Sequence, residues 1–393
     1  MKRRDFIGAT LAGAAALIGN AAVTRAQIGM RARIKDLRVV QLRVEREIGV
    51  LDNTNFIPGM RVKYAVGGGS ILQVVTDQGL IGIGPGVDNS TLERARTLLQ
   101  GKNPFDIEQH AGGLRALGRH GASIETALWD AIGKLTGVPL YKLWGGAKDV
   151  VLTYCSLMTT SNPEERAERA LRMKSLGWKG IKVRSSLPTQ KEDVRVVELI
   201  RKACGDDFMI LCDGNKAYGN LVPWDIRRAT ETARAFQSLG VYWLEEPLPQ
   251  YSLRELAELN NKLEMPLAGG EGTVTENELY NLIQARAYDV LNCEVATHGV
   301  AAVRRVQDVG LPFGVTVVPH NGDGRLQTIC QMHLVGSWAN SPLAEIIHEP
   351  PLAGIDDQFS VFDAPPKLNK DGTFTLPQRP GLGVEIRPEL LAS

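Results

Sequence analysis

The stretch VYWLEEP, residues 241–247, reads as a short apolar strand that ends in two adjacent carboxylates and a proline. It is one of a series of short apolar runs that start roughly every 25 to 30 residues after residue 150, most of them separated by a helix-like stretch. This spacing is typical of β-strand, helix, β-strand units, in which neighbouring strands are parallel. The runs are VLTYCS, GIKVR, FMILCDG, VYWLEE, PLAGGE, YDVLNCE, FGVTVVPH and LAEII. Eight such strands predict a parallel (β/α) barrel over residues 151–353.

An open, doubly wound sheet is the alternative for such a pattern, but we find no GxGxxG turn after a first strand. Residues 27–150 begin with strand-like segments, among them a hairpin that turns at Asp77-Gln78-Gly79. A helix follows, and we expect Ser123 to cap its start and Gly137 to end it. This region is therefore predicted to be a separate α+β domain. Residues 354–393 are rich in Pro and Asp and are expected to pack back on that domain.

Residues 1–26 are predicted to be a signal peptide of the twin-arginine type. They combine a basic start that contains Arg3-Arg4, an apolar Ala/Gly/Leu stretch and a small-residue exit near Ala26. A membrane anchor is the alternative, but the apolar stretch is shorter than the ~20 residues that a span needs. We therefore expect a periplasmic protein that keeps no stable membrane anchor after cleavage.

The overall composition argues against several classes of partner. The 393 residues carry a formal net charge of +1, so the chain has no electrostatic signature of nucleic-acid or anionic-membrane binding. Its five cysteines are an odd number without a CxxC pair, and we expect them to be small buried residues rather than a disulfide framework. Association into a homo-oligomer is left open.

Carboxylates end three consecutive predicted strands, at Asp213, at the pair Glu245-Glu246 and at Glu271. Because all parallel strands of a barrel end on one face, these groups are expected to lie side by side. Such carboxylates repel one another unless a cation neutralises them, and oxygen ligands favour Mg²⁺. Side chains alternate along a strand, so only one glutamate of the pair can face this site, and the sequence leaves open which one.

Several motifs carry a resemblance to a known family. They are KVR at residues 182–184, DGNKAY with Asp213 and Asn215, WLEEP, GGE with Glu271, VPH with His320, and ALWDAIGKLTGVPLYKLWGG. Together they resemble the enolase superfamily, specifically its mandelate racemase/muconate lactonizing enzyme group, over almost the whole chain after the signal. The resemblance implies a (β/α)7β TIM-like barrel under an N-terminal α+β capping domain. It also implies a Mg²⁺ ion held by Asp213, Glu245 and Glu271, with Glu246 in support.

The same resemblance implies the groups that move protons. In the superfamily a lysine or histidine base works beside Mg²⁺ to remove the proton α to a carboxylate. Lys182 and Arg184 would lie on one side of the substrate and His320 on the other, with Glu294 orienting the histidine although relatives have the shorter aspartate there. Substrate contacts are implied for Asn215 and Glu345.

One departure from the family pattern favours a particular reaction. Arg184 stands where many members have a catalytic lysine, and arginine is a poor base because it stays protonated. A racemase needs a base on each face, whereas one good base suits dehydration of a sugar acid to a 2-keto-3-deoxy acid. His320 could take the α-proton and return it to the leaving β-hydroxyl, or it could act as the acid after Lys182 or Arg184 takes the proton. The alternatives are a racemase, epimerase or lactone cycloisomerase of the same group, and a non-catalytic exported protein that binds carboxylates.

Substrate specificity is expected to come from the long segment between the first two predicted strands, DNTNFIPGMRVKYAVGGGS. Loops of this length are often lids. Arg61, Lys63 and Tyr64 are candidates for binding the hydroxyls or a distal carboxylate of a sugar acid, and a merely solvated loop is the alternative.

Overall fold

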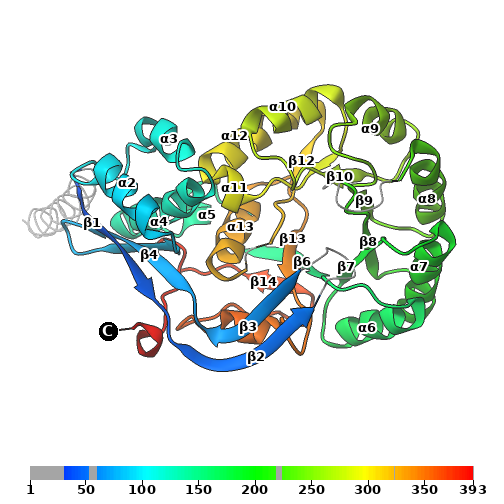
Figure 1. The fold of residues 1–393 in the computed structure, drawn as a ribbon, viewed down its shortest axis with the longest axis horizontal. Coiled ribbons are helices and arrows are strands. Elements are labelled where there is room, and N and C mark those ends of the chain that lie inside the picture. The colour runs from blue at the N-terminus through cyan, green and yellow to red at the C-terminus, as the bar shows by residue number, and fades with distance from the viewer. Residues whose placement is uncertain (1–30, 53–59, 218–223, 323, 393) are drawn as a thin grey trace, which may run out of the picture.

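Eight short parallel strands form one curled sheet in the part of the chain that the computed structural model describes, residues 31–52, 60–217, 224–322 and 324–392 (Figure 1). Their order across the sheet is β12-β11-β10-β9-β8-β7-β6-β13. The strands are β6 (Val150–Ser156), β7 (Gly180–Arg184), β8 (Met209–Asp213), β9 (Trp243–Glu245), β10 (Leu267–Gly269), β11 (Val290–Leu291), β12 (Thr316–Val317) and β13 (Ala344–Ile347). Each of the eight predicted runs coincides with one of these strands, although β6 begins one residue before its run, and the barrel prediction is confirmed.

Helices cover the outside of this sheet. They are α6 (Pro163–Ser175), α7 (Gln190–Cys204), α8 (Ile226–Ser238), α9 (Leu253–Asn260), α10 (Glu276–Ala285), α11 (Val295–His298), α12 (Val300–Gly310), the 3-10 helix η1 (Leu311–Phe313) and α13 (Arg325–Ser337). Alternation along the strands separates two layers of core. Trp243 packs with Tyr154 and Leu211 inside the barrel, whereas Leu244 and Cys212 belong to the larger cluster that faces the helices.

Strand register brings the polar strand ends together. Arg184 on β7 pairs with Asp213 on β8, and Asp213 in turn pairs with Glu245 on β9. Because neighbouring strands lie only ≈ 4.8 Å apart, side chains on the same face at these positions must meet.

The residues before the barrel form the capping domain, which lies at the left of Figure 1. Its elements are β1 (Ile34–Gln41), β2 (Val44–Asp52), β3 (Arg61–Gly67), β4 (Ser70–Thr76), β5 (Ile81–Pro85), α2 (Asn89–Leu99), α3 (Ile107–Arg115), α4 (Arg119–Thr136) and α5 (Leu140–Leu143). Strands β1, β4 and β5 make one antiparallel sheet, while β2 and β3 form a separate hairpin. The predicted turn at Gly79 joins β4 to β5, and its φ of 78° suits glycine.

Helix α4 begins earlier than the sequence suggested. Its N-cap is Gly118, so Ser123 does not cap it but lies buried inside the helix, and that prediction is wrong. The physical reason is packing: Gly84 of β5 approaches the Ser123 carbonyl so closely that a Cβ there would lie 2.5 Å from it. Helical packing against the sheet thus begins before the residue that would make the best local cap. The predicted end is confirmed, because Gly137 is the C-cap with a left-handed φ of 74°.

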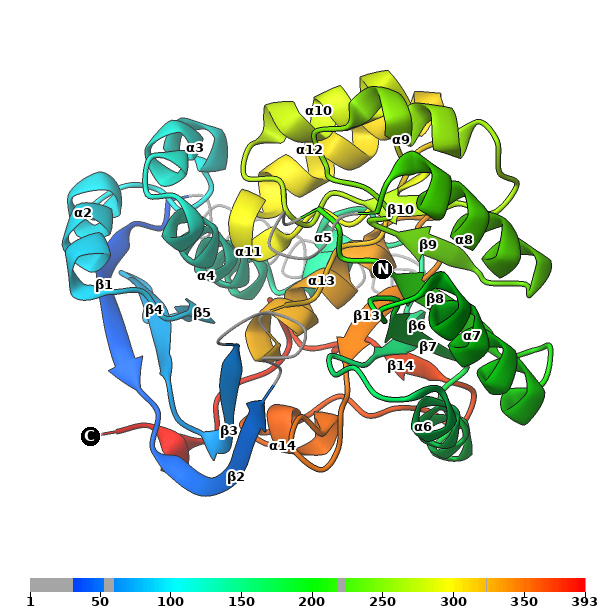
Figure 2. The ribbon, with the colours of Figure 1, turned by 45° about the vertical axis from the view of Figure 1, so that its right-hand side comes forward.

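The C-terminal segment touches both domains. It contains α14 (Ile355–Phe359), β14 (Thr373–Thr375) and the 3-10 helix η2 (Pro388–Leu390). Strand β14 pairs antiparallel with β6 of the barrel, while Leu391 bridges to Leu42 beside the capping sheet. Figure 2 shows the β2–β3 hairpin beside α14, and Arg325 at the start of α13 donates hydrogen bonds to the carbonyls of Ala65, Gly67 and Gly68.

Some predictions fall on residues that the structure does not describe. The signal peptide lies within residues 1–30, and residues 53–59 of the long loop are also outside the described ranges. Export and the domain limits therefore stay predictions. All five cysteines are buried and free, as expected. Among the described helices, none is both long and apolar enough to cross a membrane.

Candidate active site

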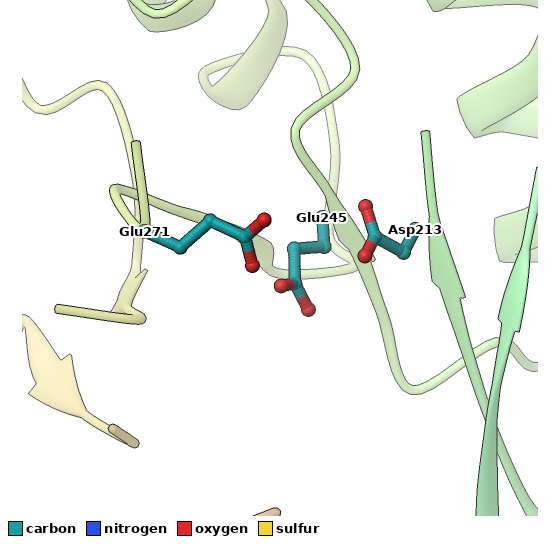
Figure 3. A group of neighbouring side chains, drawn as sticks. All are labelled: Asp213, Glu245 and Glu271. Carbon is teal, nitrogen blue, oxygen red and sulfur yellow. The ribbon is translucent and has the colours of Figure 1, made fainter. Parts of the chain in front are cut away.

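Three carboxylates meet at the C-terminal ends of the strands. Figure 3 shows Asp213 and Glu271 pointing toward Glu245, which lies between them. Each offers an oxygen within 4.8 Å of the others, and all three side chains are buried. Burial and the neighbouring carboxylates raise the pKa of Glu245 to about 8, even though Lys182 opposes that shift. Such a set of buried oxygen donors fits a hard divalent cation such as Mg²⁺, which would neutralise the repulsion.

The two adjacent glutamates have different surroundings. Glu245 faces the barrel interior, where Trp243 Nε1 donates to its Oε2 at 3.3 Å. Glu246 has a left-handed φ of 44° and is fully buried. Neither of its carboxylate oxygens has a hydrogen-bond partner among the described residues. Burial, together with the charges of Glu271 and Asp213, raises the pKa of Glu246 well above its usual range. The structure thus places Glu245, the first glutamate of the pair, in the cluster with Asp213 and Glu271.

Lys182 lies beneath the carboxylates with no exposed surface. Its Nζ is 2.9 Å from Glu245 Oε1, 2.9 Å from Glu345 Oε1 and 3.6 Å from Asp213 Oδ2. Burial alone would lower the pKa of this amine, but Glu245 and Glu345 outweigh it and raise the pKa well above its ordinary value. Lys182 is therefore a protonated amine whose charge is matched by carboxylates.

Arg184 and Asn215 hold the outer side of Asp213. Arg184 Nη1 pairs with Asp213 Oδ2 and also donates to Asn215 Oδ1 at 3.0 Å. Asn215 in turn donates to Asp213 through its backbone N–H at 2.9 Å and its Nδ2 at 3.0 Å. Burial opposes the charge of Arg184, but Asp213 and the other carboxylates raise its pKa further. This side of the site is a fixed network of charges.

His320 lies across the site between two carboxylates. Its Nε2 is 3.1 Å from Glu271 Oε2, and its Nδ1 is 3.3 Å from Glu294 Oε1. Burial would lower the pKa of this imidazole, but Glu271, Glu294 and Glu345 together raise it to about 10. The longer side chain of Glu294, compared with aspartate, does not prevent it from reaching Nδ1.

Glu345 on β13 completes the ring of charges. Burial would raise its pKa, but Lys182 and His320 outweigh burial and hold the pKa at about 2. Asn321, which the sequence analysis missed, donates its backbone N–H to Glu345 Oε2 at 3.0 Å and its Nδ2 to the Glu345 carbonyl at 3.0 Å. Its position directly after His320 in VPHN was the available signal.

The three candidates for substrate recognition on the β2–β3 hairpin divide between its faces. Arg61 and Lys63 are exposed and pair across the hairpin with Asp52 and Glu47, each at 3.4 Å. Tyr64 points the other way, and its Oη lies 3.6 Å from Met158 Sδ at the barrel mouth. Because side chains alternate along a strand, the hairpin cannot present all three to the site. The structure does not bring Arg61 and Lys63 to the carboxylates.

Comparisons with known proteins agree with this geometry. Residues 165–390, more than half of the chain, match the family described as "Enolase C-terminal domain-like". Arabinonate dehydratase of Saccharolobus solfataricus is 32% identical over 271 residues, which cover 68% of this chain and 69% of that protein. N-succinyl-L-Arg/Lys racemase of Bacillus cereus is 26% identical over 356 residues, which cover 82% of this chain and 88% of that protein.

A solved structure matches over a longer part of the chain. D-glucarate dehydratase from Agrobacterium tumefaciens, complexed with magnesium, superposes with a TM-score of 0.79 at 25% identity and covers 90% of this chain and 96% of that one. The match therefore includes the capping domain as well as the barrel. The two domains, the order of the strand-end carboxylates and the family match all agree. This chain therefore belongs to the enolase superfamily, in its mandelate racemase/muconate lactonizing enzyme group.

Proposed function

We propose that this enzyme is a Mg²⁺-dependent dehydratase of sugar acids. It would remove the proton α to the substrate carboxylate and expel the β-hydroxyl, giving a 2-keto-3-deoxy acid. The observation that carries the proposal is the asymmetry of the site. His320 is a titratable group held by Glu294, whereas the opposite side presents Arg184, which stays charged, and Lys182, whose amine is matched by Glu245 and Glu345.

This asymmetry suits a reaction that needs one proton acceptor. A racemase must remove a proton from one face and return it to the other, so it needs a second group that can lose a proton. Dehydration can use the same imidazole twice, first as base and then as acid toward the leaving hydroxyl. The site therefore supports elimination better than racemisation.

The chain's own residues account for the proton transfers. Without a metal, Glu271, Glu294 and Glu345 favour protonated His320, and Mg²⁺ on Glu271 would offset one of these charges and favour the neutral imidazole. In that form His320 Nε2 accepts the α-proton while Glu294 holds the Nδ1–H, and the C–H electron pair moves toward the substrate carboxylate. The imidazolium then gives its proton to the β-hydroxyl, whose C–O bond breaks as water leaves. The resulting enol takes a proton at C3 and becomes the ketone. Lys182 and Arg184 keep positive charge beside the substrate carboxylate.

The metal would be held by Asp213, Glu245 and Glu271, whose buried oxygens fit it. When bound, Mg²⁺ would supply positive charge where the substrate carboxylate gains electron density.

The comparisons support a sugar acid as substrate without choosing one. Their names include arabinonate dehydratase and D-xylonate dehydratase, the latter 27% identical over 353 residues. A lactone cycloisomerase is the second candidate, because it also needs a single proton acceptor. D-galactarolactone cycloisomerase of Agrobacterium fabrum is 25% identical over 350 residues.

Proton NMR tests the proposal directly. The protein from residue 27 onward is mixed in D₂O with Mg²⁺ and pooled aldonic and aldaric acids. A new 3-deoxy signal is expected, and it identifies the acid. Loss of an α-proton signal without that product would mean racemisation or epimerisation and would overturn dehydration. Opening of the ring of an added aldarolactone to an isomeric open-chain acid would favour the cycloisomerase.

A further inference from the structure

The two oxygens of the Glu294 carboxylate contact different partners. Oε1 faces His320 Nδ1 at 3.3 Å, while Oε2 accepts a hydrogen bond from Thr297 Oγ1 at 3.0 Å. Arg119 of α4 lies farther away, with its Nη2 3.9 Å from Oε2. The Thr297 hydroxyl is therefore the close hydrogen-bond partner of the outer oxygen. Burial would raise the pKa of Glu294, but His320, Thr297 and Arg119 outweigh it and lower the pKa.

The backbone places the Thr297 hydroxyl beside this carboxylate. Glu294 is the N-cap of α11, and the Thr297 N–H donates to the Glu294 carbonyl at 3.2 Å. A threonine three residues after the N-cap thus lies above the side chain of the cap residue. The hydroxyl reaches Glu294 without any rearrangement of the loop.

On the opposite side, the carboxylate occupies space that is open only because residue 322 is glycine. A Cβ at Gly322 would lie 2.8 Å from Glu294 Oε1 and 3.0 Å from His320 Cε1. The contact between carboxylate and imidazole therefore fills the space that a side chain at residue 322 would occupy. Thr297 holds the carboxylate from one side, and the bare backbone of Gly322 leaves room for it on the other.

A cleft of about 500 Å³ lies beside this carboxylate. It lies between the capping domain and the barrel, where Figure 1 shows α4 beside α11, and both Glu294 and Thr297 line it. Water in this cleft can compete for the outer oxygen of Glu294. Glutamate has one more rotatable side-chain bond than aspartate. Without the hydrogen bond from Thr297, its carboxylate would therefore adopt more orientations.

We infer that Thr297 is a positioning residue that acts through Glu294 to fix the orientation and tautomer of His320. This role rests on the proposed function, in which His320 accepts and returns the proton. Thr297 does not touch the reacting atoms, so its loss should change the proton-transfer step and not substrate binding. Partners of this kind, one step removed from a catalytic group, contribute on the order of 10- to 100-fold to activity.

The test compares three variants. Thr297→Val keeps the shape of the side chain but removes the hydroxyl, and we expect kcat to fall about tenfold with little change in KM. Thr297→Ser keeps the hydroxyl and should restore most of kcat. Gly322→Ala should lower kcat like Thr297→Val, because its Cβ displaces the carboxylate. Thermal melting checks that each variant folds.

A second readout does not depend on turnover. In the Mg²⁺-loaded protein labelled with ¹⁵N-histidine, the Nδ1–H proton of His320 should lie far downfield and exchange slowly. Thr297→Val should shift it upfield and speed its exchange with water, and Thr297→Ser should not. Unchanged kcat and an unchanged resonance in Thr297→Val would overturn the inference. So would a loss of kcat that Thr297→Ser fails to restore. If the wild-type enzyme dehydrates no sugar acid, the proposed function fails, while the resonance still decides the role of Thr297.

Discussion

The two sides of the barrel mouth use charged residues in different ways. On the β7 side, Lys182 and Arg184 are each paired with carboxylates of the metal group or of β13. On the β11–β12 side, His320 lies between Glu271 and Glu294, at 3.1 and 3.3 Å. The first side consists of cations that keep their protons, and the second contains an imidazole that can gain and lose one.

Under the proposed function, this difference separates the side that transfers protons from the side that holds charge. A buried cation with matched carboxylates is preorganised to stabilise negative charge, but it offers no proton acceptor. An imidazole oriented by a carboxylate can act as a base and then as an acid. The division of tasks is therefore built from the choice of residue type at two strand ends.

The strongest challenge to this division is removal of the imidazole. We expect His320→Asn to lower kcat for dehydration by about 10²- to 10⁴-fold, the usual contribution of a positioned acid–base group. The 3-deoxy product signal in NMR measures the loss. Because His320 is not one of the three carboxylates, Mg²⁺ binding should persist and can be followed by calorimetry. Full turnover in this variant would remove His320 from the mechanism.

A smaller effect is expected when the other side is given a base. Arg184→Lys keeps a positive charge but loses the forked guanidinium that contacts Asp213 and Asn215. Dehydration should fall about tenfold, as is common when a charged hydrogen bond is lost. A lysine can also release its proton, so α-proton exchange without dehydration should appear in D₂O. If no exchange appears, the identity of residue 184 is not what separates the two sides.

The smallest expected effect is a change in the stability of the metal-free protein when Glu246 is replaced. Because its folded pKa is raised above the unfolded value of about 4.3, the folded state holds its proton more tightly than the unfolded state does. The wild type should then lose stability as pH rises above that value, and Glu246→Gln should remove this loss. Denaturation in EDTA at pH 5 and pH 8 measures it, and the variant should gain relative to wild type at the higher pH.

Glu245→Gln is the matched control for that experiment. Glu245 also has a raised pKa, so its removal should likewise relieve a loss of stability at the higher pH, offset by the lost pairing with buried Lys182. The two neighbouring glutamates should differ in Mg²⁺ binding, which is expected to weaken in Glu245→Gln and to persist in Glu246→Gln. Equal loss of Mg²⁺ binding in both variants would mean that both carboxylates hold the metal.

Much of the site could be predicted from the sequence because it depends on local periodicity. The apolar runs, their spacing and the acidic residue at the end of three of them predicted strands that end on one face, and the structure has β8, β9 and β10 there. Parallel strands cannot place their carboxyl ends anywhere else. His320 and Glu294 followed from the resemblance, and the structure brings their side chains together.

Other features depended on residues far apart in the sequence. Alternation could not say whether Glu245 or Glu246 faces inward, because the phase of a strand is set by what packs around it, here Trp243 inside the barrel. The phase of the β2–β3 hairpin was ambiguous in the same way. Arg61 and Lys63 were predicted together with Tyr64 as substrate contacts, although the hairpin turns the first two outward.

The sequence by itself determined which residue types stand at each strand end, since backbone geometry makes that a local property. The tertiary structure alone decided which of them meet. Thr297, Gly322 and Asn321 each lie close in sequence to Glu294 or His320. Their roles arise only because packing brings His320 to 3.3 Å from Glu294 and Asn321 to 3.0 Å from Glu345. Distances of that size are set by packing between distant segments, and a pattern along the chain does not contain them.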